Sequence, residues 1–135
     1  EDAEIAFMLM GYACGTGRVA VDILREKGEK VGLIKLRVFR PFPFEEVINA
    51  TRNLRALAIL DESVSIGGVG GPLFSEVRST LYDLDKKPKT LGFIVGLGGR
   101  DVRVEDFLTI HEKTKAVLDG REKIENDFMF LQVRE

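Results

Sequence analysis

The sequence predicts an α/β fold of three layers, in which a mostly parallel, twisted sheet of four to five strands carries helices on both faces. Four short apolar runs, each about the length of a buried strand, alternate with segments of helical period. A glycine- or proline-rich turn separates each run from its helix, most clearly in the segment from Leu91 to Asp101. Right-handed crossovers leave a few doubly wound strand orders, among which the sequence does not choose.

Length and composition favour one globular domain. The chain has 135 residues, of which 44% are hydrophobic and 31% charged, and a net charge of −2 that favours neither nucleic acid nor an anionic membrane as partner. No apolar run approaches the roughly 18 residues that span a bilayer. The single cysteine fits the reducing cytoplasm. Because the chain starts at Glu1 rather than at Met, and a strand is expected almost at once, we expect a piece of a longer protein.

The first strand is expected at Ile5–Met10, a continuous apolar run typical of a strand buried on both faces. Residues 11–17 form a glycine-rich loop, and Thr16 is a candidate N-cap for the helix that follows. Gly28 is expected to end this helix in a left-handed conformation. The apolar positions expected to face inward are Val19, Ile23 and Leu24.

The second strand is expected at Val31–Val38. Its second half alternates apolar and charged residues, which favours a place near an edge of the sheet. Two prolines in residues 39–43 exclude a helix there, and Pro43 suits the first position of the next helix. The apolar face of that helix is expected to contain Val47, Ile48 and Leu54.

The third and fourth strands are expected at Leu57–Leu60 and Leu91–Val95. Pro72 opens the helix between them, and a last long helix runs from about Val104 to Asp119, where Gly120 ends it. The inward positions expected in these two helices are Leu73, Val77, Leu81, Leu84, Val104, Phe107, Leu108 and Leu118.

Residues 127–133 alternate in apolar character and predict either a fifth strand or an extension that packs on a partner. We therefore expect an α/β domain over residues 1–122 and a C-terminal extension or edge strand over residues 123–135.

The unusual sequence follows the strands, in residues 11–17, 40–43, 61–71 and 96–101. In open α/β sheets this carboxyl edge binds ligands or partners, and helix N-termini there present amides to anions. One interpretation is an autonomous module that binds an anion such as coenzyme A. The other is that the glycines serve only tight turns and close packing. Neither the G-x-G-x-x-G spacing nor a phosphate loop is present.

Few side chains predict chemistry by themselves. Asp61, Glu62, Arg100 and Asp101 are acid–base candidates, but helix caps, ion pairs or interface contacts explain them better. Cys14 is read as a small buried residue rather than a reactive thiol, and it cannot ligate an iron–sulfur cluster alone. His111 has no second histidine or cysteine at ligand spacing, so we expect no metal site.

Four motifs carry a family resemblance: Lys35–Pro43, Ala58–Asp61, Gly71–Val77 and Gly92–Val102. Together they resemble the 2-oxoacid:ferredoxin oxidoreductases such as pyruvate synthase, in the alpha-subunit domain similar to the C-terminal domain of transketolase. The resemblance covers nearly the whole chain in the same order. Arg103 departs from it, since a Thr or Ser helix cap is expected there, at a cost of about 1 kcal/mol.

The resemblance implies a thiamine diphosphate enzyme that oxidatively decarboxylates a 2-oxoacid, such as pyruvate, to acyl-CoA. Thiamine diphosphate with Mg forms the carbanion, coenzyme A accepts the acyl group, and iron–sulfur clusters pass electrons to ferredoxin. It also implies that this chain alone is not catalytic, binds none of these cofactors, and packs against other domains and subunits. No catalytic residue is transferred. The interface candidates, all members of matched motifs, are Arg40, Asp61, Gly98, Gly99, Arg100 and Asp101.

Overall fold

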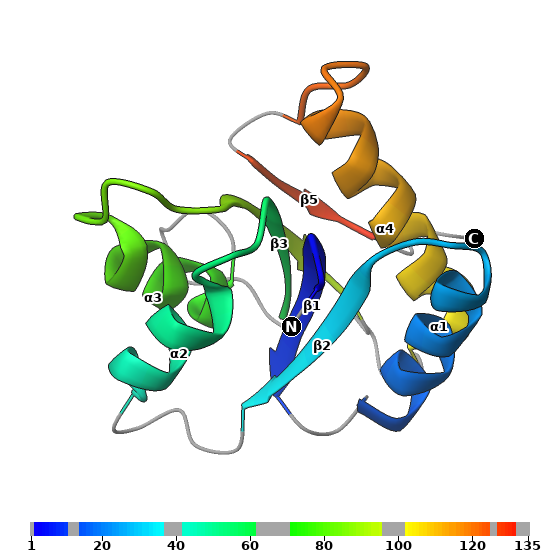
Figure 1. The fold of residues 1–135 in the computed structure, drawn as a ribbon, viewed down its shortest axis with the longest axis horizontal. Coiled ribbons are helices and arrows are strands. Elements are labelled where there is room, and N and C mark those ends of the chain that lie inside the picture. The colour runs from blue at the N-terminus through cyan, green and yellow to red at the C-terminus, as the bar shows by residue number, and fades with distance from the viewer. Residues whose placement is uncertain are drawn as a thin grey trace.

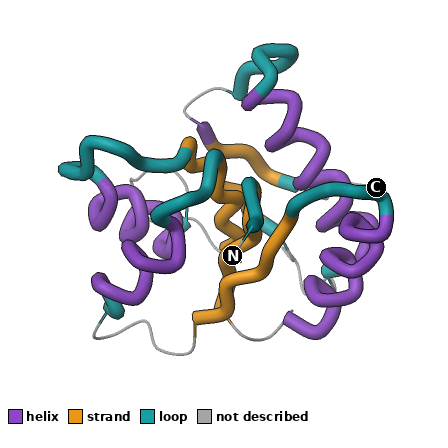
Figure 2. Tube along the Cα trace, in the orientation of Figure 1, coloured by secondary structure: helices purple, strands orange, loops and turns teal. Residues whose placement is uncertain are grey.

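Five parallel strands form one sheet in the order β2-β1-β3-β4-β5, with helices packed on both faces (Figure 1). The structure is a computed structural model that describes residues 2–10, 14–36, 42–61, 71–95, 102–124 and 127–131. In Figure 2 the strands lie between two groups of helices. The three-layer α/β architecture expected from the sequence is therefore confirmed.

The centre of the sheet is formed by β1 (Ile5–Met10) and β3 (Ala56–Asp61), whose residues are almost all buried. Ile5 pairs with residues on both neighbouring strands, Val31 of β2 and Ala56 of β3. A strand with parallel neighbours on both sides and helices above and below has no polar face, which explains the continuous apolar runs.

The outer strands are β2 (Val31–Leu36), β4 (Lys89–Ile94) and β5 (Phe128–Phe130). β2 is an edge strand, as its alternating pattern indicated; residues 37 and 38 lie outside the described part. β5 pairs in parallel with β4 from Gly92 and Phe128 onward. The division of the chain at residue 122 stays a prediction.

Two helices cover each face of the sheet (Figure 1). α1 (Cys14–Glu26) and α4 (Val104–Leu118) pack on one face, and α2 (Phe44–Thr51) and α3 (Pro72–Leu81) on the other. No helix among the described residues is long and apolar enough to cross a membrane.

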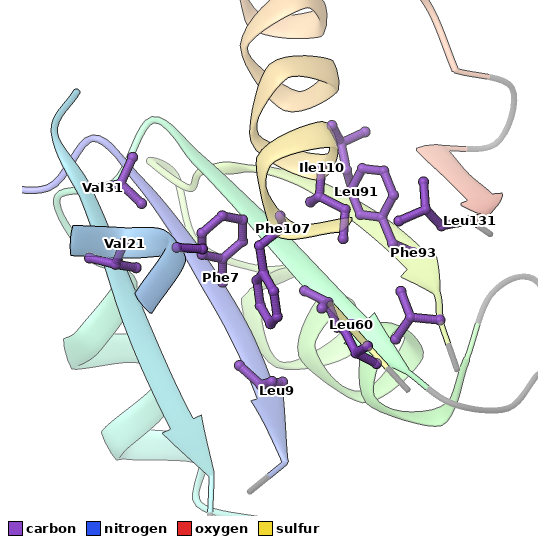
Figure 3. Close-up of a cluster of buried hydrophobic side chains, with 14 of the residues drawn as sticks. Phe7, Leu9, Val21, Val31, Leu60, Leu91, Phe93, Phe107, Ile110 and Leu131 are labelled. Carbon is purple, nitrogen blue, oxygen red and sulfur yellow. The ribbon is translucent and has the colours of Figure 1, made fainter. Parts of the chain in front are cut away.

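Each face has its own apolar core because successive strand residues point to opposite sides. In the α1/α4 layer, drawn in Figure 3, Phe7 and Phe107 meet edge to face with ring centroids 5.1 Å apart. The α2/α3 layer is built around Met8, Ile59 and Phe74, all of them buried.

Three local expectations at the helix starts are wrong. α1 begins at Cys14, so Thr16 lies inside the helix and does not cap it. Val19, which was expected to face inward, is 48% exposed. The buried residues of α1 are Cys14, Gly17, Ala20, Val21 and Leu24. The reason is a tertiary contact, because a Cβ at Gly17 would lie 3.1 Å from the Phe107 ring. Pro43 precedes α2 as its N-cap residue instead of opening it.

The ends of α1 and α4 agree better with the sequence, whereas Leu54 and Leu84, which were expected on α2 and α3, follow the last residues of those helices. Gly28 and Gly120 both have positive φ, at 89° and 78°, as expected for left-handed residues that follow helices. At the start of α4, Asp106 Oδ2 accepts a hydrogen bond of 2.8 Å from the Arg103 backbone N–H. The missing Thr or Ser at position 103 is thus partly compensated by a carboxylate one turn inside the helix.

Gly92, in the middle of β4, is a position where side-chain volume is excluded. A Cβ there would lie 2.7 Å from Cγ and Cδ1 of Phe74, whose ring is buried and stacks on Phe128. We expect Gly92→Ala to lower the free energy of unfolding by about 1–3 kcal/mol, because the core must move to accept the methyl group. Urea unfolding followed by circular dichroism measures this.

Gly15→Ala is the matched control. Gly15 lies exposed in α1, and a Cβ there meets nothing within 4 Å. The same substitution is expected to raise stability by up to about 1 kcal/mol through helix propensity. Equal effects of the two substitutions would contradict the close contact at Gly92.

Candidate functional site

The carboxyl edge of the sheet is the candidate functional site. All five strands are parallel, so the residues that follow them meet at one edge. The chain turns to β2 on one side of β1 and to β3 on the other, so the topological switch point lies between β1 and β3. Asp61 ends β3 at this point, and α1 begins a few residues after β1.

Asp61 caps α3 from the neighbouring strand. Its Oδ1 accepts a hydrogen bond from the Leu73 N–H and its Oδ2 one from the Phe74 N–H, both 2.9 Å long. The N-cap residue, Gly71, has no side chain of its own for this task. The Asp61 carbonyl also accepts the Val95 N–H at 2.8 Å, which extends the pairing of β3 with β4. Asp61 therefore joins β3, β4 and the start of α3.

Gly71 is needed where the chain approaches this carboxylate. A Cβ built on Gly71 would overlap the Cβ and the carboxyl group of Asp61. Its φ of −89° is open to any residue, so space and not backbone strain selects glycine here. The pair fixes both ends of the segment 62–70.

The electrostatics of Asp61 follow from its position. Burial raises the pKa of the Asp61 carboxyl, and the hydrogen bonds from the Phe74 and Leu73 amides act in the opposite direction. Both carboxylate oxygens are already engaged by backbone donors. A helix cap, one of the roles weighed for Asp61 from the sequence, accounts for these contacts.

Cys14 is the first residue of α1 and is buried. Burial raises the pKa of the Cys14 thiol, although Lys35 and Arg18 pull it down. A thiol with a raised pKa forms little of the reactive thiolate at neutral pH. The expectation of a small buried residue is confirmed.

Most of the other candidates lie outside the described residues, namely Arg40, Glu62, Gly98, Gly99, Arg100 and Asp101. Their grouping at the carboxyl edge, and the interface role given to five of them, stays a prediction. Across residues 2–10, 14–36, 42–61, 71–95, 102–124 and 127–131, no three His, Cys, Asp or Glu side chains are grouped closely enough to hold a metal ion.

The structure adds two residues to this edge that sequence reasoning missed. Phe44 opens α2 and is 52% exposed, with its ring edge to face against Phe42 at 5.5 Å. Val19, in the second turn of α1, is exposed as well. That these apolar side chains point outward follows only from where each helix begins and which of its faces packs on the sheet. The two residues lie on helices that cover opposite faces of the sheet, and single exposed apolar side chains of this kind are common on protein surfaces.

Comparison with known families gives one match that spans most of the chain. The family model described as "Pyruvate:ferredoxin oxidoreductase core domain II" matches residues 3–107. Pyruvate synthase subunit PorA of Methanosarcina barkeri is 43% identical over 132 residues, which cover 98% of this chain and 33% of the relative. Ketoisovalerate oxidoreductase subunit VorA of Pyrococcus furiosus is 43% identical over 120 residues, covering 89% and 30%.

The chain therefore spans about a third of the length of the curated relatives it matches. Among solved structures, a split gene transketolase in an inactive beta4 tetramer superposes with a TM-score of 0.64 at 17% identity. The match covers 84% of this chain and 39% of that one. This likeness concerns the fold alone, and it confirms the transketolase-like architecture expected from the sequence.

Proposed function

The chain belongs to the pyruvate:ferredoxin oxidoreductase core domain II family, and from this we propose that it is an assembly domain in the alpha subunit of a 2-oxoacid:ferredoxin oxidoreductase. The family match over residues 3–107 is the observation that carries the proposal. The named relatives are subunits of pyruvate synthase and ketoisovalerate oxidoreductase, so pyruvate is the first 2-oxoacid to be tried.

In the proposed parent enzyme a 2-oxoacid and coenzyme A yield acyl-CoA and carbon dioxide, and two electrons pass to ferredoxin. Thiamine diphosphate with Mg supplies the carbanion chemistry, and iron–sulfur clusters carry the electrons. The described residues of this chain offer no group of ligands for a metal, and its one cysteine does not hold a cluster. We therefore assign the reaction to the rest of the enzyme, which we place in the cytoplasm.

The role proposed for this chain is contact with the other domains and subunits through its carboxyl edge. Asp61 supports a structural role, because both of its oxygens are engaged by α3. The same contacts disfavour an anion at the start of α3, where the alternative coenzyme A module would need free amides. Phe44 and Val19 are exposed apolar residues near the edge at which the sequence predicts the candidates Arg40 and Arg100.

The test is assembly of the full-length alpha subunit with its partner subunits. Phe44→Ser and Arg100→Ala are expected to weaken assembly by at least tenfold in Kd, since buried aromatic and arginine side chains dominate the energetics of interfaces. Size-exclusion chromatography at graded concentrations and analytical ultracentrifugation measure this. Retained 2-oxoacid turnover at high subunit concentration would show that the chemistry lies elsewhere.

Tyr82→Ser is the matched control. Tyr82 is 74% exposed and follows α3, at the opposite end of that helix from Asp61. Its substitution also removes one exposed aromatic ring, yet it is expected to leave assembly unchanged. If Phe44→Ser and Arg100→Ala assemble as tightly as Tyr82→Ser, the carboxyl edge is not the interface.

A further inference from the structure

His111, the only histidine of the chain, is buried in α4 with an unsatisfied ring nitrogen. Its exposed fraction is 4%, and its Nε2 has no hydrogen-bond partner in the described part of the chain. Leaving a buried polar group unpaired costs about 1–3 kcal/mol, and such groups in native proteins call for an explanation.

The carboxylate of Glu29 lies near the ring but is paired with Lys115. Glu29 Oε1 lies 3.7 Å from His111 Nε2, which is too long for a hydrogen bond. Both oxygens of Glu29 lie 2.9 Å from Lys115 Nζ. Lys115 stands one helical turn after His111, so the two cationic groups of α4 face the same carboxylate. Glu29 belongs to the turn that joins α1 to β2.

These three side chains line a hollow of about 320 Å³ between the end of α1 and α4. Its other charged lining residues are Lys27, Glu112 and Arg121. When the His111 imidazole is neutral, three positively charged and two negatively charged side chains line the hollow. The strands under α4 contribute apolar side chains to this layer, including Phe7, Leu60 and Leu91. The charged groups that act on the His111 ring are Glu29, Lys115 and Glu112.

We propose that His111, Glu29 and Lys115 form a proton-operated latch that ties α4 to the α1–β2 turn. With neutral His111, Lys115 holds Glu29 and the latch is closed. A proton taken from solvent at the imidazole creates a buried cation one helical turn from Lys115 and adds positive charge to a hollow that already has an excess of it. Water reaches this cation only when α4 opens locally from the turn, so the pairing is loosened.

The direction of the pH effect follows from the environment of the ring. Burial lowers the pKa of His111, and the charge of Lys115 lowers it further. The charges of Glu29 and Glu112 raise this pKa, but the net shift is downward. The unfolded chain, with a histidine pKa of about 6.5, then binds this proton more readily than the folded chain. The contribution of the latch is complete above pH 6.5 and is lost as the pH falls from 6.5 through the folded value.

The first measurement is the NMR titration of the His111 ring in the 135-residue chain. We expect a midpoint below 6.5, and backbone amide shifts of Glu29 and Lys115 with the same midpoint. Lys115→Met is expected to raise the midpoint and Glu29→Gln to lower it, because each removes one of the opposing charges. Lys113→Met is the matched control, since Lys113 pairs with Glu122 at 3.3 Å and does not line the hollow.

The second measurement is amide hydrogen exchange at pH 7.5 and 6.0, corrected for intrinsic rates. Opening of α4 and of residues 27–30 is expected to increase by up to about fourfold from pH 7.5 to 6.0, the limit for one proton with an open-state pKa of about 6.5, whereas α3 on the other face does not respond. His111→Gln is expected to abolish this difference. The comparison with His111→Gln also cancels the contribution of Asp61, whose raised pKa gives the opposite sign.

A ring midpoint at or above 6.5 would overturn the latch. Shifts of the midpoint in the same direction in Lys115→Met and Glu29→Gln, or equal acid loosening of α3 and α4, would overturn it too. The Lys115→Met titration stays informative even if His111→Gln folds poorly, because the Lys115 side chain is 43% exposed and its removal leaves no cavity in the core.

Discussion

Replacing Phe107 by alanine is expected to lower the free energy of unfolding by about 3–5 kcal/mol, the largest effect of any substitution considered. The Phe107 ring is fully buried in the layer that α4 forms with α1 on one face of the sheet. It meets Phe7 of β1 edge to face, with ring centroids 5.1 Å apart (Figure 3). It also lies against Gly17 of α1. Alanine removes the packed ring and the aromatic pair together and leaves a cavity in the core.

The measurement is urea or thermal unfolding, with a fall in Tm of about 10–20 °C for a domain of this size. Thr109→Ala, at an exposed position of the same helix, is the control and is expected to change stability by less than about 0.5 kcal/mol. If Phe107→Ala does not fold, Phe107→Leu keeps most of the volume and is expected to cost about 1–2 kcal/mol. A loss below 1 kcal/mol in Phe107→Ala would contradict its central place in the layer.

Replacing Asp61 by alanine is expected to cost about 2–3 kcal/mol. The substitution removes a helix cap and leaves the Leu73 and Phe74 amides without their acceptor at a partly buried site. Because the same residue joins β3 to α3, we expect the amides at the start of α3 to exchange their protons faster in the variant. Chemical unfolding and amide hydrogen exchange measure the two effects.

Asp61→Asn is the control for this cap. The amide side chain has nearly the same size and keeps one oxygen acceptor, so it is expected to recover about half of the stability that alanine loses. Gly71→Ala tests the same contact from the other side, since its methyl group would displace the carboxylate. If Asn and Ala are equally destabilising, the hydrogen bonds to α3 are not what Asp61 contributes.

Much of the fold was predictable because it depends on local composition. A strand buried on both faces must be apolar throughout, and Ile5–Met10 was therefore predicted with its observed limits. Gly28 and Gly120 follow helices in a conformation that favours glycine, so their positions marked the helix ends. The helix starts were less predictable. Gly17 lies in α1 against its low helix propensity because Phe107, ninety positions away in the sequence, needs the space.

The sequence predicted which edge of the sheet contains the candidate site, but it did not predict the side-chain contacts there. Glycine- and proline-rich turns after each strand identified the carboxyl edge, since parallel strands all end there. Nothing local indicated that Phe44 and Val19 point outward, or that Asp61 accepts from amides twelve and thirteen residues further along. The pair Glu29–Lys115 joins residues 86 positions apart, and only the packing of α4 on the α1–β2 turn brings it together.

The sequence by itself determined the fold class, the approximate positions of the strands, the ends of α1 and α4 and, through its motifs, the family. These follow from periodicity, chain stiffness and residue preference, which act over a few neighbouring residues. The tertiary structure alone decided the strand order, the frame of α1, the cap on α3 and the surroundings of His111. Each of these depends on which distant residues compete for the same volume or the same hydrogen bond, and that competition exists only once the layers are packed.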